Sequence, residues 1–161
     1  MNDMDLVTKA SEHSRYLRRL VAAEEHFAGA LVAHLDTPWD ASLMQAELDM
    51  AKIIDAHSLQ VALRKLRQSV MGQIIVRDLA GMGDLHEVMR MCTDLAQVAV
   101  HYALRYHANW LAEIHGLPTN ADGTPMELTV VGMGKLGGGE LNVSSDIDLV
   151  YLYADEGERK S

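Results

Sequence analysis

The chain has 161 residues, 48% of them apolar, which is enough for a globular domain with a real core. Its formal net charge of -9 argues against broad binding to a nucleic-acid backbone, which needs clustered Lys and Arg, and leaves room for metal ions beside carboxylates. The single cysteine, Cys92, excludes a disulfide within the chain, and its apolar surroundings predict a core residue.

The N-terminal stretch MNDMDLVTKASEHSRY is polar and acidic, unlike a signal peptide, which opens basic and then turns apolar. No stretch reaches the ~18 uninterrupted apolar residues of a membrane span. The most apolar one, LAQVAVHYALRYHANWLA, is broken by Gln97, His101, Arg105 and His107. These features predict a cytoplasmic protein that binds neither membrane nor nucleic acid.

Residues 1 to about 116 carry apolar side chains at spacings of three and four, which predicts one helix after another. The pattern predicts a first helix that begins near Tyr16 and ends near Asp36. Thr37 followed by Pro38 is typical of an N-cap and a first helical position, so the next helix is expected to begin there and to continue through Ile54.

Ser58 is the predicted N-cap of a third helix, which ends around Gly81. Asp84 is the predicted N-cap of a long fourth helix, which ends at Gly116. Arg77 and Asp78, near the end of the third helix, are expected to form a structural pair.

The segment LPTNADGTP has the composition of turns, and the character of the chain changes after it. LTVV and DLVYLY, on either side of a glycine-rich stretch, are predicted strands. We therefore expect a helical region over residues 1–120 and the beginning of a second, α/β part over 121–161. Because two strands cannot form a stable sheet with its own core, they are expected to pack on the helices or to continue in a longer chain.

Two nucleotide-binding patterns match the glycine stretch only in part. Residues 132–137 match G-x-G-x-x-G after a strand, but too little chain remains for the crossover helix of a dinucleotide fold. A helix beginning at Gly134 would favour that fold and contradict the nucleotidyltransferase interpretation considered next. A P-loop is set aside, because Thr129 stands where its first glycine belongs and Leu136 replaces the Ser or Thr that binds magnesium.

A third pattern, a glycine pair followed by Asp-x-Asp on a strand, fits better. Residues i and i+2 of a strand point to one face, so Asp146 and Asp148 are expected about 6 to 7 Å apart at the backbone, with Ile147 and Leu149 facing the core. Two such carboxylates can converge on one or two magnesium ions. Glycines let bare backbone N–H groups approach phosphate oxygens. The pattern indicates a nucleotidyltransferase site.

The stretch GMGKLGGGELNVSSDIDLVYLY closely resembles the signature of the bacterial bifunctional glutamine synthetase adenylyltransferase/adenylyl-removing enzymes. The form GKLGGxELNxSSDID is more similar to their N-terminal, adenylyl-removing domain than to their C-terminal one, and the upstream helical run LRKLRQSVMGQIIVRDLAGMGDLHEVMRMCTDLAQ resembles the helices before that site. The resemblance implies a mostly α N-terminal part followed by the first strands of an α+β nucleotidyltransferase fold of the DNA polymerase β type.

The resemblance also implies an activity and its partners: removal of AMP from a tyrosine of adenylylated glutamine synthetase by phosphorolysis, giving ADP, under control of the PII signal protein and glutamine. The other half of the same enzyme would be a further partner. Carried over, Asp146 and Asp148 are Mg²⁺ ligands and catalytic residues, Gly137 and Gly138 contact nucleotide phosphates, and Lys135 and Ser145 assist in holding phosphate and orienting the loop. ADP or ATP and phosphate would be the substrates.

This chain departs from the family pattern in two ways. The second small residue of the pair is often Ser in the wider superfamily, whereas here it is Gly138, so only the backbone donor is kept. The family's third carboxylate stands on a later strand, and the remaining acids here, Asp155, Glu156 and Glu158, are expected to be solvated. We therefore expect a truncated catalytic unit, inactive alone. The alternatives are another Mg-dependent nucleotidyltransferase and a helical interaction module without catalysis.

Overall fold

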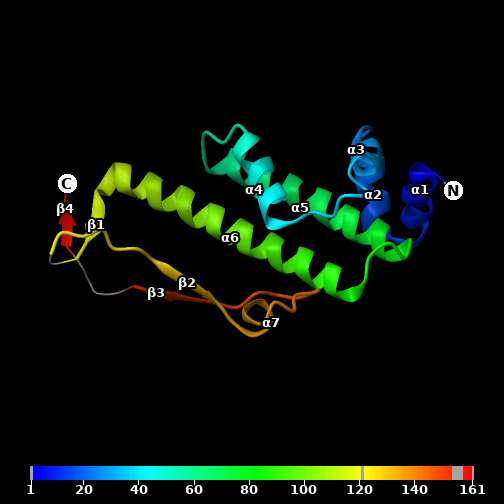
Figure 1. The fold of residues 1–161 in the computed structure, drawn as a ribbon. Coiled ribbons are helices and arrows are strands. Elements are labelled where there is room, and N and C mark those ends of the chain that lie inside the picture. Colours follow the sequence, from blue (N-terminus) through cyan, green and yellow to red (C-terminus); the bar gives the residue numbers. More distant parts are fainter. Residues whose placement is uncertain (1, 121, 154–157, 161) are drawn as a thin grey trace.

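The computed structural model describes residues 2–120, 122–153 and 158–160 (Figure 1). In the order of the chain, its elements are α1 (Asp3–His13), α2 (Arg15–Ala23), α3 (Phe27–Ala33), α4 (Ala41–Met50), α5 (Ala56–Leu79), α6 (Leu85–His115), β1 (Leu117–Thr119), β2 (Thr129–Gly132), α7 (Gly134–Gly137), β3 (Leu149–Leu152) and β4 (Glu158–Lys160). The predicted order of a helical region followed by short strands is confirmed. Within the described residues, no helix has both the length and the apolar character needed to cross a membrane.

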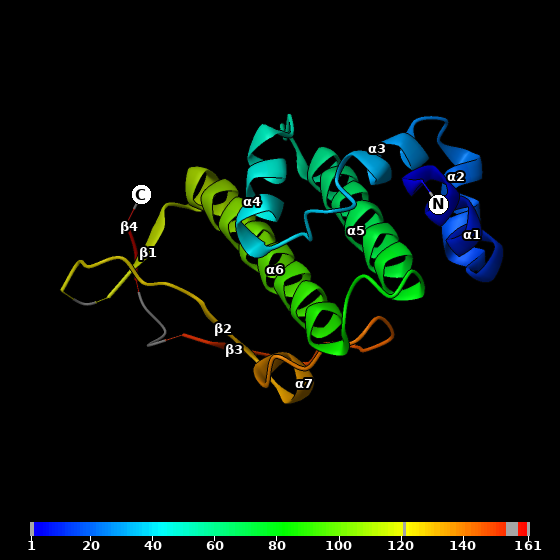
Figure 2. The same ribbon diagram turned by 45° about the vertical axis from the view of Figure 1, so that its right-hand side comes forward.

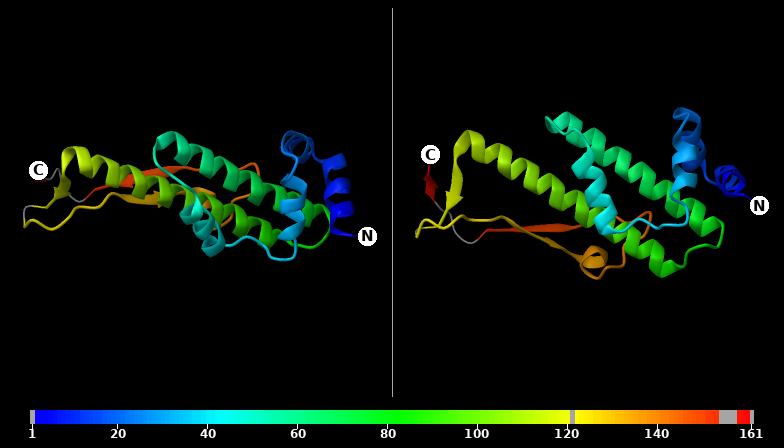
Figure 3. Two further views of the ribbon diagram at one scale, coloured as in Figure 1. Left: turned by 90° about the horizontal axis from the view of Figure 1, so that it is seen from above. Right: turned by 45° about the horizontal axis from the view of Figure 1, so that its top comes forward.

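The long helices α5 and α6 lie side by side and run in opposite directions (Figures 1 and 2). One core cluster joins them to α4 and to the chain around β2 and β3, and its buried members are Met44, Leu48, Leu66, Val70, Met71, Ile74, Met91, Cys92, Leu95, Val98, Leu136 and Leu141. In Figures 1 and 3, α4 and the hairpin of β2 and β3 lie on opposite sides of α6. The expectation that the strands pack on the helices is therefore correct. Cys92 is a core residue as predicted, and burial raises the pKa of its thiol.

Helix α6 has the predicted ends. The carboxylate of Asp84 accepts a hydrogen bond from the Glu87 N–H at 2.9 Å, as an N-cap does. Gly116 ends the helix with a φ of 78°, in the left-handed region that glycine adopts at no steric cost. The sequence signals suffice here because both ends depend on local chemistry.

The predicted helix from Tyr16 to Asp36 is wrong, because the chain breaks it at Glu24 into α2 and α3. The two short helices share a second core cluster with α1 and α5, in which Leu17 and Leu20 of α2 and Phe27 and Leu31 of α3 are buried. Gly72 on α5 makes the contact close, since a Cβ there would stand 3.1 Å from both the Phe27 and Leu31 side chains.

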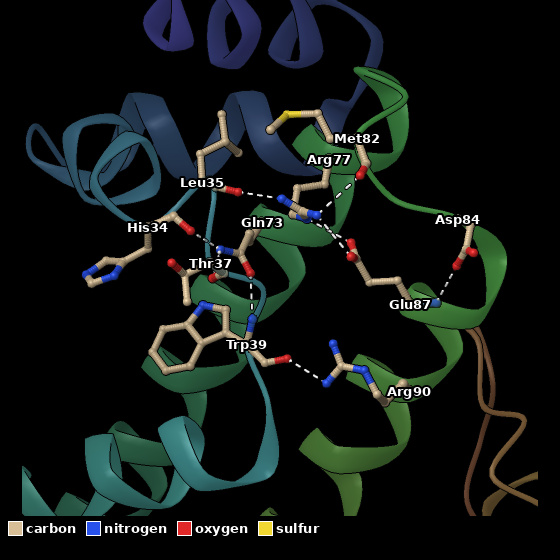
Figure 4. Close-up of polar contacts among 10 residues, drawn as sticks. All are labelled: His34, Leu35, Thr37, Trp39, Gln73, Arg77, Met82, Asp84, Glu87 and Arg90. Carbon is tan, nitrogen blue, oxygen red and sulfur yellow. Dashed lines mark hydrogen bonds and ion pairs between the residues drawn. The ribbon is translucent and has the colours of Figure 1, made fainter.

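The predicted N-cap at Thr37 is also wrong, since Asp40 caps α4 and Ile54 lies beyond its end. The reason is the buried side chain of Gln73 on α5, which holds the preceding segment in a non-helical conformation (Figure 4). Its Nε2 donates to the carbonyls of His34 and Thr37, and its Oε1 accepts from the Trp39 N–H at 2.9 Å. Hydrogen bonds from a side chain far away in the sequence thus outweigh the local signal for a helix N-terminus at Thr37.

Arg77 is a structural residue, but its partner differs from the prediction. Its guanidinium pairs with Glu87 of α6 at 2.7 and 2.9 Å (Figure 4). Asp78 is exposed. The Arg77 guanidinium also donates to the carbonyls of Leu35, at 2.6 Å, and Met82, at 3.3 Å. One buried cation therefore joins α5 to α6 and to two connecting segments.

The strands form two separate two-stranded antiparallel sheets, β1 with β4 and β2 with β3. The first sheet lies partly in the segment predicted as turns, where Asn120 and Thr124 close a turn by two hydrogen bonds. The described strands agree with a helical part followed by the first strands of an α+β fold. They are too few to establish the polymerase β type, which stays a prediction, as does the boundary near residue 120.

The N-terminus of α5 gives a prediction about pH. Asp55, rather than Ser58, is the N-cap, and its pKa lies below the ordinary value of 3.8 because the Ser58 hydroxyl and N–H both donate to its carboxylate. A lowered pKa means that this cap contributes stability above pH 3.8 and loses the contribution as pH falls through the folded-state value. A carbon-detected NMR titration should show the Asp55 pKa rising toward 3.8 in Ser58→Ala and unchanged in Ser42→Ala. Equal values in Ser58→Ala and the parent would contradict this account.

Candidate nucleotidyltransferase site

The glycine-rich connection lies between two antiparallel strands. Gly132 of β2 stands opposite Leu149 of β3, and the Met133 N–H donates to the Asp148 carbonyl at 2.9 Å. A dinucleotide fold requires parallel strands joined by a long crossover helix. The helix α7 does begin at Gly134, but it has only four residues. The antiparallel pairing therefore excludes the dinucleotide interpretation.

Two glycines allow the connection to fold back on its own strand. A Cβ on Gly137 would stand 2.5 Å from the Gly132 carbonyl oxygen, which is backbone and cannot move aside. Gly139, with a φ of 72°, ends α7, and the Glu140 N–H then donates to the Lys135 carbonyl at 2.7 Å. Leu136 and Leu141, which flank this end, are buried in the core shared with the helices. The glycines thus fix a compact turn against the helical part.

The amides of the two predicted phosphate-binding glycines already have partners. The Gly137 N–H donates to the Met133 carbonyl at 3.2 Å, and the Gly138 N–H donates to the Gly134 carbonyl at 3.0 Å. Any phosphate would have to share or replace these bonds, so the contact stays a prediction. The Lys135 side chain is exposed and makes no ion pair with a described residue.

Ser145 lies in a four-residue turn just before the aspartates. Its hydroxyl accepts a hydrogen bond from the Asn142 N–H at 3.1 Å, and its own N–H donates to the Asn142 carbonyl at 3.1 Å. This geometry agrees with the expected role of Ser145 in orienting the loop. Asn142 was not among the predicted residues, although an Asn side chain often forms a turn by accepting from the backbone N–H two residues on.

Asp146 and Asp148 are both exposed, and neither carboxylate bonds to another described residue. They stand just outside β3, which begins at Leu149, whereas the sequence predicted a strand from Asp146. The reason is that Met133 is the last residue able to pair with this strand before the chain turns into α7. Leu149 packs on the core as expected, but Ile147 is 40% exposed, so the prediction that Ile147 faces the core is wrong.

The donor set suits a hard cation. Carboxylate oxygens are the ligands that Mg²⁺ prefers, and two carboxylates two residues apart can share one ion. Within the described residues, no group of three or more His, Cys, Asp or Glu gathers at one place. Of the other acids named above, Asp155 and Glu156 lie outside the described residues. The described part of the chain therefore offers two carboxylates that could hold such a cation, and their role as its ligands stays a prediction.

A cavity of about 500 Å³ separates α6 from the hairpin, and its lining residues are Gln97, Val100, His101, Leu104, Glu127, Leu128, Val130, Gly132, Leu136, Gly137 and Leu149. Asp146 and Asp148 do not line it. Leu149, the first residue of β3, lines this cavity, whereas Asp148 directly before it is exposed. The aspartates thus belong to the solvent side of the hairpin.

The two adjacent glycines make a matched pair of variants. We expect Gly137→Ala to lower the free energy of unfolding by about 1–3 kcal/mol, because its methyl group would press on the Gly132 carbonyl. Gly138→Ala should fold as well as the parent, since its methyl group would meet no atom closer than 3.6 Å. Urea denaturation of both variants checks this. Equal midpoints for the two would show that the close approach at Gly137 is not what fixes the turn.

The comparisons with known proteins indicate the class of the adenylyltransferases. The family model described as glutamate-ammonia ligase adenylyltransferase matches residues 4–161, nearly the whole chain. The chain therefore belongs to the glutamate-ammonia ligase adenylyltransferase family, and the resemblance stated from the sequence is confirmed.

Three relatives bear the same name, bifunctional glutamine synthetase adenylyltransferase/adenylyl-removing enzyme. The chain is 47% identical to the one from Bordetella pertussis over 90% of its length, 42% identical to the one from Chromobacterium violaceum over 98%, and 41% identical to the one from Nitrosomonas eutropha over 95%. It spans only 16%, 18% and 17% of the length of these relatives, respectively.

Proposed function

We propose that this chain is part of the deadenylylating half of a glutamine synthetase-modifying enzyme, which removes AMP from adenylyl-tyrosine by Mg²⁺-dependent phosphorolysis. The observation that carries the proposal is the position of Asp146 and Asp148, which follow the glycine-rich connection, are exposed and bond to no other described residue. Family membership supports the chemistry of adenylyl groups, and the form GKLGGxELNxSSDID supports the adenylyl-removing half over the other.

The reaction is an exchange at one phosphorus atom. An oxygen of inorganic phosphate forms a bond to the adenylyl phosphorus, the bond from that phosphorus to the tyrosine oxygen breaks, and ADP and a free tyrosine are formed. Asp146 and Asp148 would hold the cation, which when bound neutralises charge on the phosphate oxygens. Lys135, exposed on α7, adds a positive charge near the same end of the hairpin.

The partners follow as part of the same proposal. The substrate protein is adenylylated glutamine synthetase, the regulator is the PII signal protein, and the adenylyltransferase half acts in the opposite direction. The relatives are named as bifunctional enzymes, which supports a second half. This chain covers about a sixth of their length, so further ligands of the site are expected elsewhere in such an enzyme.

A calorimetric titration of ADP into this chain tests the proposal. We expect binding to tighten by about tenfold or more when Mg²⁺ is added, because the cation bridges the carboxylates and the phosphates. Asp146→Asn/Asp148→Asn should remove this dependence on Mg²⁺. ADP binding that is equal in the parent and the double variant would contradict the site.

A second candidate, a helical interaction module, has one observation in its favour. The last turns of α6 expose Trp110, Leu111 and Ile114, at the spacing of one helix face, with exposed fractions of 49%, 46% and 54%. Stoichiometric binding of PII or of the adenylyltransferase half, with no Mg²⁺-dependent ADP binding, would favour this module over the enzyme. Another Mg²⁺-dependent nucleotidyltransferase would instead bind a nucleoside triphosphate and leave adenylylated glutamine synthetase unchanged.

A further inference from the structure

The turn of residues 142–145 precedes the two aspartates, and Asn142 takes part in each of the hydrogen bonds described below. Its side-chain Oδ1 accepts from both the N–H and the hydroxyl of Ser144, each at 3.0 Å. Its backbone N–H donates to the Ser145 hydroxyl at 3.1 Å, and its carbonyl accepts from the Ser145 N–H at 3.1 Å. These four hydrogen bonds, all made by Asn142, therefore close residues 142–145 into a turn.

This turn lies between two anchored points. Leu141, directly before Asn142, is 3% exposed and belongs to the core shared with α4, α5 and α6. On the other side, Leu149 packs on the same core, and the Asp148 carbonyl is held by the Met133 N–H. The stretch between these anchors is exposed, with only Ser145 half-buried, so packing does little to fix it.

The direction of Asp146 therefore depends on the turn. Asp146 follows Ser145 immediately, and no bond of its own side chain to a described residue holds it. An exposed segment with free backbone angles has to be ordered when a ligand binds, and ordering it beforehand lowers that cost. Groups that hold metal ligands in place commonly matter nearly as much for affinity as the ligands themselves.

We propose that Asn142 is a positioning residue, which holds the turn so that the Asp146 carboxylate is presented beside that of Asp148 to a divalent cation. The proposal rests on the proposed function, since it takes the two aspartates as cation ligands. It adds a residue whose role is separate from binding phosphate or nucleotide. It also explains why a polar turn of this length stands between a buried leucine and an acidic pair.

The test is a titration of this chain with Mn²⁺ alone, followed by electron paramagnetic resonance of the free ion. Asn142→Ala is expected to weaken Mn²⁺ binding by about tenfold. Asn142→Gln should do the same, because its longer side chain carries the same amide but cannot close the two-residue bridge. Asn142→Asp should keep near-parent affinity, since it preserves the Oδ1 acceptor. Val143→Asp, which adds the same charge to an exposed neighbour with Asn142 intact, controls for charge alone.

Two further readouts separate positioning from folding. The thermal midpoint of Asn142→Ala should equal that of the parent, while the Ser144 and Ser145 amides should exchange with solvent faster even without metal. Parent-like Mn²⁺ affinity in Asn142→Ala, combined with weakened affinity in Asp146→Asn, would overturn the role of Asn142 and leave the proposed function standing. Unchanged affinity in Asp146→Asn and Asp148→Asn, or no binding of Mn²⁺ by the parent, would overturn the proposed metal site and this inference with it.

Discussion

Replacing Arg77 by alanine is expected to lower the free energy of unfolding by about 3 kcal/mol, the largest effect on stability that we expect from one substitution in this chain. The loss leaves the Glu87 carboxylate without its bidentate partner and the Leu35 carbonyl without a donor. Breaking a buried ion pair from one side is costly because the remaining charge stays desolvated. Denaturation by urea, with circular dichroism as the signal, measures the change.

Two control variants make the result specific. Arg105→Ala removes an exposed ion pair with Asp49, 3.5 Å long, and a contact with the Tyr102 ring, so it should cost less than about 1 kcal/mol. Arg77→Met/Glu87→Leu removes both charges and should recover part of the loss, because no carboxylate is then stranded. An Arg77→Ala variant as stable as the Arg105→Ala variant would mean that the buried pair does not hold the helical part together.

The largest effect on activity is expected from Asp146→Asn/Asp148→Asn. A chimera in which this chain replaces the matched segment of the Bordetella pertussis enzyme provides a full-length setting for the measurement. There the double variant should lower the rate of deadenylylation by more than about a hundredfold, because a bound cation contributes several kcal/mol to stabilising transition-state charge.

The same variant should leave stability unchanged, which excludes misfolding as the cause. Both carboxylates are exposed and bond to no described residue, and removing two negative charges from a chain of net charge -9 reduces self-repulsion. A chimera that carries both asparagines and deadenylylates at the parent rate would show that Asp146 and Asp148 do not hold the cation.

The sequence predicted those features of the fold that depend on neighbours in the chain. Asp84 and Gly116 mark the two ends of α6, because an N-cap and a left-handed glycine act within one turn. The break at Glu24 and the displaced start of α4 were missed for the opposite reason. They follow from contacts with α5, made by Gly72 and Gln73, which are far away in the sequence.

The candidate site divides in the same way. The sequence alone showed the spacing of Asp146 and Asp148 and the family signature. The structure leaves both carboxylates exposed. The hydrogen bonds of α7 could not be predicted from the sequence, because a run of glycines does not show which of its N–H groups will donate within a one-turn helix. The part played by Asn142 emerges only when the four bonds of its turn are seen together.

The product formed from adenylylated glutamine synthetase shows most directly in which direction the chemistry runs. Incubated with the chimera, Mg²⁺ and radiolabelled inorganic phosphate, the adenylylated protein should lose its AMP and yield labelled ADP in equal amount. The parent, but not Asp146→Asn/Asp148→Asn, should do so. Release of unlabelled AMP would indicate hydrolysis instead, and release of no nucleotide, with both halves of the chimera folded, would contradict the assignment of this chain to the deadenylylating half.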